Sequence, residues 1–254
     1  TAIRVADNEL RAHAGAAKAI RALVDDAKVG MAIDVNQIVP ATGSERDRVA
    51  AGQWSSARDA WFLDPLFGRG YPALGLDAHR AAGHLDGIEL ADLPPRDLDY
   101  LGLNYYRRDS VAARSDRPFD WDIGPVSGSE QTQMSWHVAS DGLRDTLLEL
   151  NQAYAPPEIV LTENGAAYPD TVDSDGRVRD GDRLDYLARH VAAAAETLRA
   201  GVPLTGYHVW SLLDNYEWSL GYTRRFGLVH VDYASQRRTP KDSARWYRRL
   251  TART

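Results

Sequence analysis

Residues 159–165 read Ile-Val-Leu-Thr-Glu-Asn-Gly, a run of β-forming side chains that ends on an acid, an amide and a glycine. Three large apolar residues in succession are typical of a strand that is buried on both faces. Glu163 stands where this strand is predicted to end. From these residues alone, Glu163 could cap a helix, bind a metal, act as a base or act as a nucleophile, and the rest of the chain has to decide.

This strand belongs to a series of four similar units, each a short apolar strand followed by a helical segment. The predicted strands cover residues 29–40, 98–106, 158–165 and 203–213, and the helical segments cover 45–67, 140–154, 182–201 and 243–250. Strands that alternate with helices pair in parallel through right-handed crossovers. Long loops after the strands favour a (β/α)8 barrel, and the lack of a GxGxxG motif after any strand disfavours a dinucleotide-binding sheet. Four units are half of what such a barrel needs.

Local signals predict where some elements begin and end. Ser140 is predicted to be the N-cap of the helix that follows it. Gly201, the last residue of the segment 182–201, is predicted to be the C′ residue of that helix, where glycine tolerates a left-handed backbone. The Leu-Pro-Pro run at 93–95 is predicted to form a turn before the second strand.

Composition excludes several classes of protein. The chain has 254 residues, of which 44% are hydrophobic and 26% charged, enough for one large domain or part of a bigger one. Its net charge is −6 and it has no basic stripe, which argues against a nucleic-acid partner. The absence of cysteine excludes disulfides and cysteine-ligated zinc, which fits a cytoplasmic protein. No run approaches the roughly 18 consecutive apolar residues of a membrane span, so no membrane association is expected.

Polar and aromatic side chains gather at the predicted strand ends, where parallel barrels place their catalytic groups. The strand ends and the loop after the last strand offer Asn104, Tyr106, Glu163, Trp210, Glu217, Trp218 and Phe226. The C–H face of a pyranose ring stacks on an indole, and its hydroxyls need fixed donors and acceptors. One carboxylate can accept from two neighbouring hydroxyls at once. The pattern makes a carbohydrate site plausible.

Four stretches closely resemble glycoside hydrolase family 1, the β-glucosidase family. They are IVLTENG at 159–165, LGLNYY at 101–106, YHVWSLLDNYEWSLGYTRRFGLVHVDY at 207–233 and RRTPKDSARWY at 237–247. The resemblance covers essentially the whole chain. It implies an α/β fold, namely strands five to eight of a (β/α)8 TIM barrel, with residues 1–254 forming one partial domain. It also implies hydrolysis of β-linked glucosides or related small saccharides with retention, without a cofactor or metal.

The resemblance assigns catalytic roles to two residues. Glu163 matches the nucleophile, and Tyr106 matches the tyrosine that hydrogen-bonds it. Glu163 must be ionised to attack, and a phenol that donates to it favours the charged form.

The resemblance assigns substrate-binding roles to six further residues. Trp210 matches the stacking tryptophan, and Glu217 with Trp218 matches the pair that reads the outer sugar hydroxyls. Asn104 and Phe226 match residues of the sugar subsite, and Trp136 matches the tryptophan on the aglycone side.

The proton donor of the family is missing from this sequence. In the family, the acid/base glutamate lies in an Asn-Glu-Pro motif at the end of the fourth strand, and this chain contains no such motif. The opening segment, residues 1–27, resembles the helix that follows it. The N-terminal half is therefore expected to be absent, and the chain alone to be inactive or very weak. A complementing N-terminal half-barrel chain, self-association or a longer polypeptide would supply what is lacking, because a half-barrel leaves strand edges uncovered.

Structural alternatives remain for several of these residues. Asn104 and Tyr106 could be satisfied core polar groups, and a non-catalytic sugar-binding or scaffold module derived from a glycosidase is the alternative function. Trp54, Trp61 and Trp246 are expected to pack, Trp121 is left open, and His208 is expected to be a core histidine. The acid-rich residues 173–182 are expected to form a solvated turn rather than a calcium site.

Overall fold

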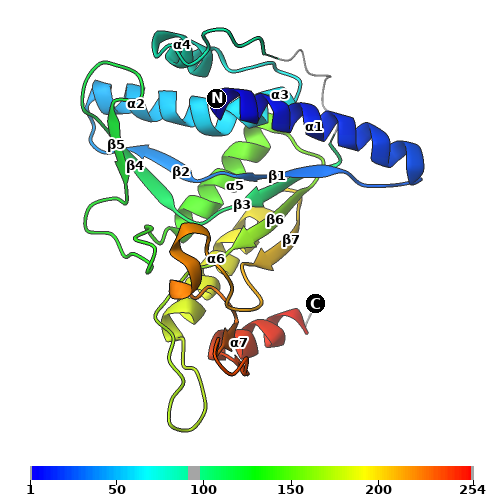
Figure 1. The fold of residues 1–254 in the computed structure, drawn as a ribbon, viewed down its shortest axis with the longest axis vertical. Helices are drawn as coiled ribbons and strands as arrows, with labels where there is room; N and C mark the ends of the chain where they lie inside the picture. Colours follow the sequence, from blue (N-terminus) through cyan, green and yellow to red (C-terminus); the bar gives the residue numbers. More distant parts are fainter. Residues whose placement is uncertain (1, 91–97, 253–254) are drawn as a thin grey trace.

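The computed structural model describes residues 2–90 and 98–252, which form an α/β fold built on one parallel sheet (Figure 1). The sheet has four strands in the order β1-β3-β6-β7, and every neighbouring pair is parallel. The strands are β1 (Gly30–Asp34), β3 (Tyr100–Asn104), β6 (Ile159–Asn164) and β7 (Leu204–Val209). The predicted alternation of parallel strands with helices is confirmed.

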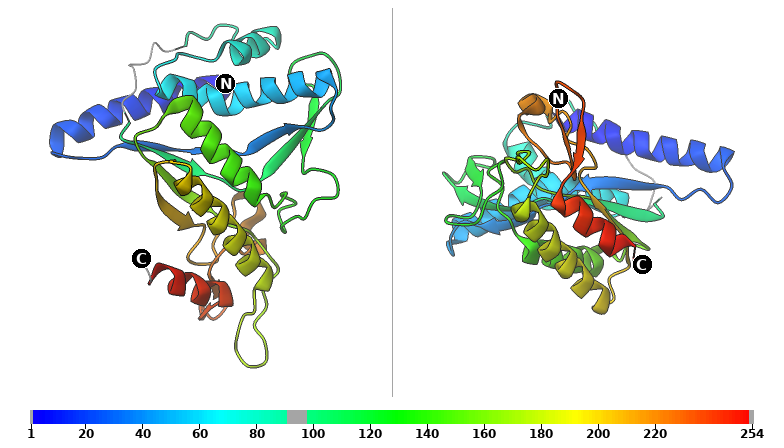
Figure 2. Two further views of the ribbon diagram at one scale, coloured as in Figure 1. Left: turned by 180° about the vertical axis from the view of Figure 1, so that it is seen from behind. Right: turned by 90° about the horizontal axis from the view of Figure 1, so that it is seen from below.

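Helices connect these strands and cover the sheet. They are α1 (Ala2–Leu23), α2 (Glu45–Ser55), α3 (Trp61–Leu66), α4 (Ala73–Ala81), α5 (Ser140–Tyr154), α6 (Gly181–Arg199) and α7 (Asp242–Thr251). A π turn, η1 (Ser56–Ala60), joins α2 to α3. Seen from behind, α5 and α6 lie side by side over one face of the sheet (Figure 2).

Two small sheets complete the described part of the chain. One contains β2 (Gln37–Pro40), β4 (Arg108–Ala113) and β5 (Trp121–Gly124), and the other pairs β8 (Val229–Val231) with β9 (Arg238–Pro240). The strand predicted over 29–40 is therefore wrong as a single element. It divides after Asp34, so that β1 joins the main sheet and β2 pairs with β4.

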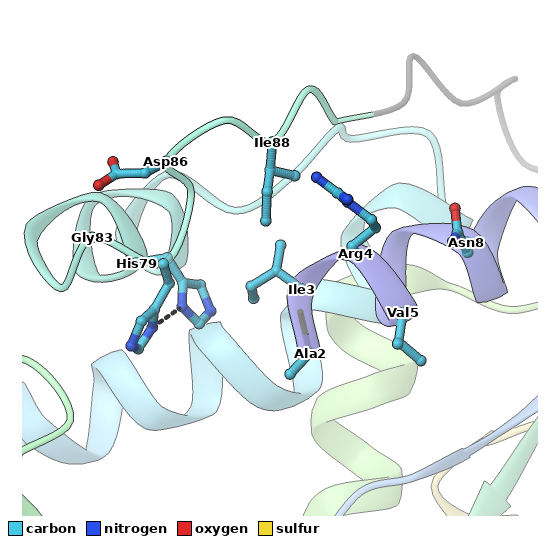
Figure 3. A pocket seen from close by; sticks show the side chains of 10 residues that line it. Ala2, Ile3, Arg4, Val5, Asn8, His79, Gly83, Asp86 and Ile88 are labelled. Carbon is cyan, nitrogen blue, oxygen red and sulfur yellow. Dashed lines mark hydrogen bonds between the residues drawn. The ribbon is translucent and has the colours of Figure 1, made fainter.

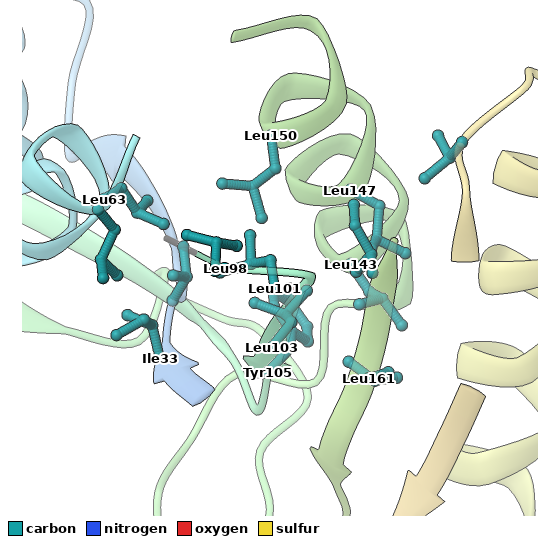
Figure 4. Close-up of a cluster of buried hydrophobic side chains, with 14 of the residues drawn as sticks. Ile33, Leu63, Leu98, Leu101, Leu103, Tyr105, Leu143, Leu147, Leu150 and Leu161 are labelled. Carbon is teal, nitrogen blue, oxygen red and sulfur yellow. The ribbon is translucent and has the colours of Figure 1, made fainter. Parts of the chain in front are cut away.

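The main core lies between the sheet and the helices. Leu103 of β3 and Leu161 of β6 are fully buried against Leu143 and Leu147 of α5 (Figure 4). These leucines recur on one face of α5 at helical spacing, which is why that helix docks on the sheet. At about 25 cal/mol per Å² of apolar area removed from water, this packing is the main stabilisation of the sheet.

The expectation of burial on both faces holds for the inner strands and fails for the outer ones. Three of the five residues of β3 are buried, whereas β1 has only Ile33 buried and β7 has only half-buried and exposed positions. In this chain β1 and β7 are the two edges of the sheet, so fewer elements cover them. His208 of β7 is consequently exposed, and its prediction as a core histidine is wrong.

Of the two predicted helix ends, the one at Gly201 is confirmed and the one at Ser140 is wrong. Gly201 follows α6 with φ of +85° and donates to Leu198 O, as predicted. Ser140 is the first residue of α5 rather than its N-cap, because Ala139 takes the cap position and offers no side-chain acceptor. The Leu-Pro-Pro run at 93–95 lies outside the described residues.

The tryptophans predicted to pack do so. Trp61 is buried, and Trp246 packs against a second core cluster that includes Tyr186 and Leu187. Trp54 of α2 contacts Trp121 edge-on, with ring centroids 6.3 Å apart. The sequence left the role of Trp121 undecided. The structure places it at the start of β5, where its ring packs against Trp54 of α2.

Candidate active site

One cavity of about 800 Å³ lies at the carboxyl ends of the parallel strands. Its lining includes all eight residues predicted to form the site, namely Asn104, Tyr106, Trp136, Glu163, Trp210, Glu217, Trp218 and Phe226. They come from β3 and the residues just after it, from β6, from the segment before α5 and from the long loop after β7. Residues up to 122 positions apart (Asn104 to Phe226) therefore share one hollow, as parallel strand ends require.

Glu163 and Tyr106 form the centre of this cavity. The Tyr106 phenol donates to Glu163 Oε2 over 2.6 Å. The parallel register places Asn104 opposite Glu163, so the residues just after β3 lie beside the end of β6. Burial, and then the bond to Glu163, raise the pKa of the Tyr106 phenol well above its ordinary value. The phenol therefore keeps its proton and acts as a donor to the carboxylate.

Asn164 fixes the end of β6 from the side opposite Glu163. Successive strand residues point to opposite faces, and the fully buried Asn164 side chain points toward α6. Its Nδ2 donates to Tyr105 O at 2.8 Å and to the Tyr186 hydroxyl at 3.0 Å. Its Oδ1 accepts from the Tyr207 hydroxyl at 2.5 Å. One amide thus ties β3, β6, β7 and α6 together directly behind the carboxylate.

Gly165 allows the ends of β6 and β7 to meet closely. A Cβ at Gly165 would lie 1.9 Å from Trp210 O, so no other residue fits without movement of the backbone. Trp210 N donates to Asn164 O at 3.0 Å, and the peptide bond between Trp210 and Ser211 is cis. The glycine of the IVLTENG run therefore brings the Trp210 indole to the cavity beside Glu163.

The remaining cavity walls are aromatic. Trp136 lies 5.4 Å from Tyr106 and 6.1 Å from Phe226 between ring centroids, and the Arg107 guanidinium stacks over the Trp136 ring at 4.9 Å. Phe226 is buried, whereas the Trp218 side chain at the rim is 84% exposed. An indole exposed to this extent at a cavity mouth is available to stack on a ligand.

Polar groups complete the site. Thr162 Oγ1 donates to Asn104 Oδ1 at 2.6 Å, which orients the Asn104 amide within the cavity wall. Burial, and then the negative charge of Glu163, raise the pKa of Glu217. The two carboxyl groups therefore interact electrostatically across the cavity.

Four lining residues were not predicted from the sequence, namely Asp34, Arg107, Asn215 and Tyr216. Asp34 ends β1 and forms an ion pair with Arg58 at 2.7 Å. Its position at a strand end is the signal that could have identified it, but the predicted strand ran on to residue 40 and hid that end.

A second large cavity, of about 860 Å³, lies away from the strand ends between the start of α1 and α4 (Figure 3). His79 and His84 approach through their Nδ1 atoms at 3.1 Å on one side of it, and Ile3, Val5 and Ile88 supply apolar walls. It lacks the combination of carboxylates and aromatic faces that the strand-end cavity holds.

Neither a metal site nor a membrane span is found in residues 2–90 and 98–252. No three His, Asp or Glu side chains there come together as metal ligands would. In the acid-rich segment 173–182, the Arg179 guanidinium pairs with Asp173 and Asp175. Over the same residues, no helix has the length and apolar character to cross a membrane.

The fold and this cavity define a protein of the parallel α/β class with a carboxylate at the centre of its candidate site. The sequence model of glycosyl hydrolase family 1 matches residues 1–254, and the chain belongs to that family.

Known members are similar over nearly the whole chain. Beta-glucosidase A of Thermotoga maritima is 39% identical over 97% of this chain and 55% of its own length, and beta-glucosidase A of Acetivibrio thermocellus is 34% identical over 98% and 57%. The solved structure of a family 1 β-glucosidase from Thermotoga maritima superposes with a TM-score of 0.90 at 37% identity, covering 99% of this chain and 56% of that one. A structure of the Thermotoga maritima enzyme in complex with castanospermine gives 0.87 at the same identity and coverage. The chain spans about half the length of the curated relatives it matches.

Proposed function

We propose that this chain is the nucleophile-bearing half of a retaining β-glycosidase that acts on β-linked glucosides or related small saccharides. The observation that carries the proposal is the 2.6 Å bond from the Tyr106 hydroxyl to Glu163 inside a cavity walled by indoles. Family membership and the β-glucosidase names of the relatives support the class of substrate.

In the proposed reaction, Glu163 Oε attacks the anomeric carbon of the bound sugar while the glycosidic C–O bond breaks. The leaving oxygen takes a proton from an acid, and a glycosyl ester on Glu163 remains. Water activated by the same acid, now a base, then attacks the anomeric carbon and releases the sugar with its configuration retained. Tyr106 orients the carboxylate throughout, and Trp210, Trp218 and Glu217 hold the ring and its outer hydroxyls.

We assign the proton-donating acid of this reaction to the other half of the barrel. A retaining site needs two carboxyl groups roughly 5–5.5 Å apart. Apart from Glu163, the acids on the described cavity wall are Asp34 and Glu217. Asp34 is engaged by Arg58, and Glu217 sits in the loop that we assign to the sugar hydroxyls. Because general-acid catalysis contributes about 10²–10⁴-fold, we expect the chain alone to be nearly inactive on ordinary glucosides.

The surface of the chain supports the interpretation as strands five to eight of a TIM barrel, in one partial domain over 1–254. Its accessible surface is 13206 Å² at 28.1 kDa, whereas the scaling relation for folded monomers gives about 11,000 Å². If a partner buried as much as this excess of roughly 2,000 Å², the two together would bury about 4,000 Å², which is in the range of obligate interfaces. The partly exposed strands β1 and β7 contribute to this excess. A complementing half-barrel or a second copy of this chain would cover these edges.

Intact-mass spectrometry with an activated 2-fluoroglucoside tests the proposal, because such a leaving group departs without a proton. The wild-type chain is expected to gain one glycosyl adduct on Glu163, and Glu163→Gln is expected to gain none. Sugar binding without any adduct would favour a non-catalytic sugar-binding module instead. Adding a separately produced N-terminal half-barrel is expected to restore hydrolysis of ordinary glucosides. A compact, well-protected monomer in size-exclusion and hydrogen-exchange experiments would contradict the half-barrel interpretation.

A further inference from the structure

A buried network of six charged side chains links the segments that follow β6 and β7. Its members are Asp170, Asp180, Arg183, Asp214, Arg225 and Lys241, and all but Arg225 have side chains no more than 3% exposed. Three acids balance three bases, as a buried cluster of charges requires. Neither the nucleophile nor the sugar-facing residues belong to it.

Asp214 closes the loop that carries the sugar-facing residues. Its Oδ1 accepts from Gly227 N at 2.9 Å, and its Oδ2 accepts from Val231 N at 3.3 Å. Residues 214 and 227 thereby form the base of one loop, which holds Glu217 and Trp218 between them. A Cβ at Gly227 would lie 2.2 Å from the backbone nitrogen of Asp214, so glycine is needed for this closure.

Lys241 connects this loop to the segment that leaves Glu163. Its fully buried Nζ donates to Asp214 Oδ1 at 2.9 Å and to Asp170 Oδ2 at 2.5 Å. Asp170 lies six residues after the end of β6, on the segment that starts at Glu163 and Asn164. Arg183 of α6 braces the same segment through Asp170 and reaches Arg225 O at 2.7 Å. Lys241 is the ammonium that joins a carboxylate of one segment to a carboxylate of the other.

We propose that Lys241, acting through Asp214, is a positioning residue that sets where Glu217 and Trp218 stand relative to Glu163. This inference rests on the proposed function. Without the ammonium, two buried carboxylates on different segments would face each other without their shared cation, and the loop 214–227 would move away. Glu163 and Tyr106 are held by other contacts, so the nucleophile itself would stay in place. The predicted consequence is a loss of ground-state recognition rather than of chemistry.

The first test is the concentration dependence of Glu163 labelling by the activated 2-fluoroglucoside in the full 254-residue chain, in its native assembly. For Lys241→Met we expect the half-saturating concentration to rise by about tenfold or more while the limiting rate falls by less than about threefold. Arg225→Met is the matched control, because Arg225 also pairs with Asp214 at 2.5 Å but does not bridge to Asp170. We expect both constants of this control to stay within about threefold of wild type.

The second test does not depend on any reaction. Hydrogen exchange of the Gly227 and Val231 amides is expected to accelerate by about tenfold or more in Lys241→Met, because their acceptor Asp214 loses the cation that ties it to Asp170. Should Lys241→Met fail to fold, Asp214→Asn keeps the side-chain shape, but its single amide oxygen replaces only one of the two carboxylate oxygens that accept from Gly227 N and Val231 N. Accelerated exchange is then expected for at least one of these two amides in that variant.

The outcomes separate the two proposals. If the wild-type chain takes no label, the proposed function fails, and the exchange experiment alone decides on Lys241. Wild-type labelling constants with wild-type exchange in both Lys241→Met and Asp214→Asn would overturn the inference. An equal loss in Arg225→Met would also overturn it, because the effect would then follow any lost charge at Asp214.

Discussion

The hydroxyl of Tyr106 and the carboxylate of Glu163 meet at 2.6 Å although 57 residues separate them in the chain. The meeting follows from the parallel pairing of β3 and β6, whose carboxyl ends finish side by side. A donated hydrogen bond stabilises the ionised form of a carboxylate and fixes its rotamer. The pair therefore has the geometry that an oriented nucleophile requires.

Tyr106→Phe is expected to slow glycosylation of Glu163 without changing the fold. A hydrogen bond to a charged group is worth about 1.5–3 kcal/mol, which corresponds to roughly a 10- to 150-fold slower limiting rate. The rate of adduct formation with the activated 2-fluoroglucoside measures it. Tyr222→Phe is the control, because the Tyr222 side chain is 56% exposed and lies outside the cavity wall. Equal rates for the two variants would contradict the assigned role.

Gly165→Ala is expected to destabilise the protein and displace Trp210. The added methyl would lie 1.9 Å from Trp210 O, and overpacking of this kind costs about 1–3 kcal/mol. Chemical denaturation gives the free energy of unfolding, and tryptophan fluorescence reports the displacement. Gly181→Ala at the start of α6 is the matched control, since a Cβ there meets nothing within 4 Å. A Gly165→Ala variant as stable as this control would show that the close approach is not required.

Tyr207→Phe is expected to weaken the support behind Glu163. The substitution removes the donor to Asn164 Oδ1 and leaves a buried amide oxygen without that partner. Such a loss costs about 1–3 kcal/mol of unfolding free energy. Equilibrium denaturation with urea measures it, and an unchanged midpoint at an unchanged m-value would argue against the network.

His190 is expected to make the fold less stable in mild acid. Burial lowers the pKa of this histidine to about 4, against about 6.5 when unfolded. As the pH falls below 6.5, the unfolded chain binds the proton first, so stability is complete above 6.5 and is lost as the pH falls toward 4. The shift corresponds to about 3 kcal/mol.

The difference between wild type and His190→Phe isolates this contribution. Burial raises the pKa of Asp59 to about 7, which acts in the opposite direction, since that stability is lost as the pH rises from 3.8 to 7. Both proteins share this effect, and it cancels in the comparison. Relative to His190→Phe, wild type should lose about 3 kcal/mol of unfolding free energy between pH 7 and pH 4. A pH-independent difference would refute the prediction.

Local sequence patterns were sufficient for much of the fold and for the members of the site. The apolar run into Glu163 predicts a buried strand that stops at an acid, and β6 ends one residue later, at Asn164. The eight predicted site residues line one cavity because they stand at strand ends or in the segments that follow them on the same side of the sheet. Their roles in catalysis remain predictions. Asp34 was missed because an apolar run continues past it, and periodicity cannot show that a chain passes from one sheet to another.

The sequence by itself determined the alternation of parallel strands with helices, the helix end at Gly201, and the family. Those features are local, because periodicity and backbone freedom depend on a few neighbouring residues. Only the tertiary structure decided that Asn164 would join four elements, that Lys241 would pair with two carboxylates, and that β1 and β7 would be edges. Such contacts link residues tens of positions apart. They form because a buried polar group is stable only when it has a hydrogen-bond partner, and that partner is known only once the chain has folded.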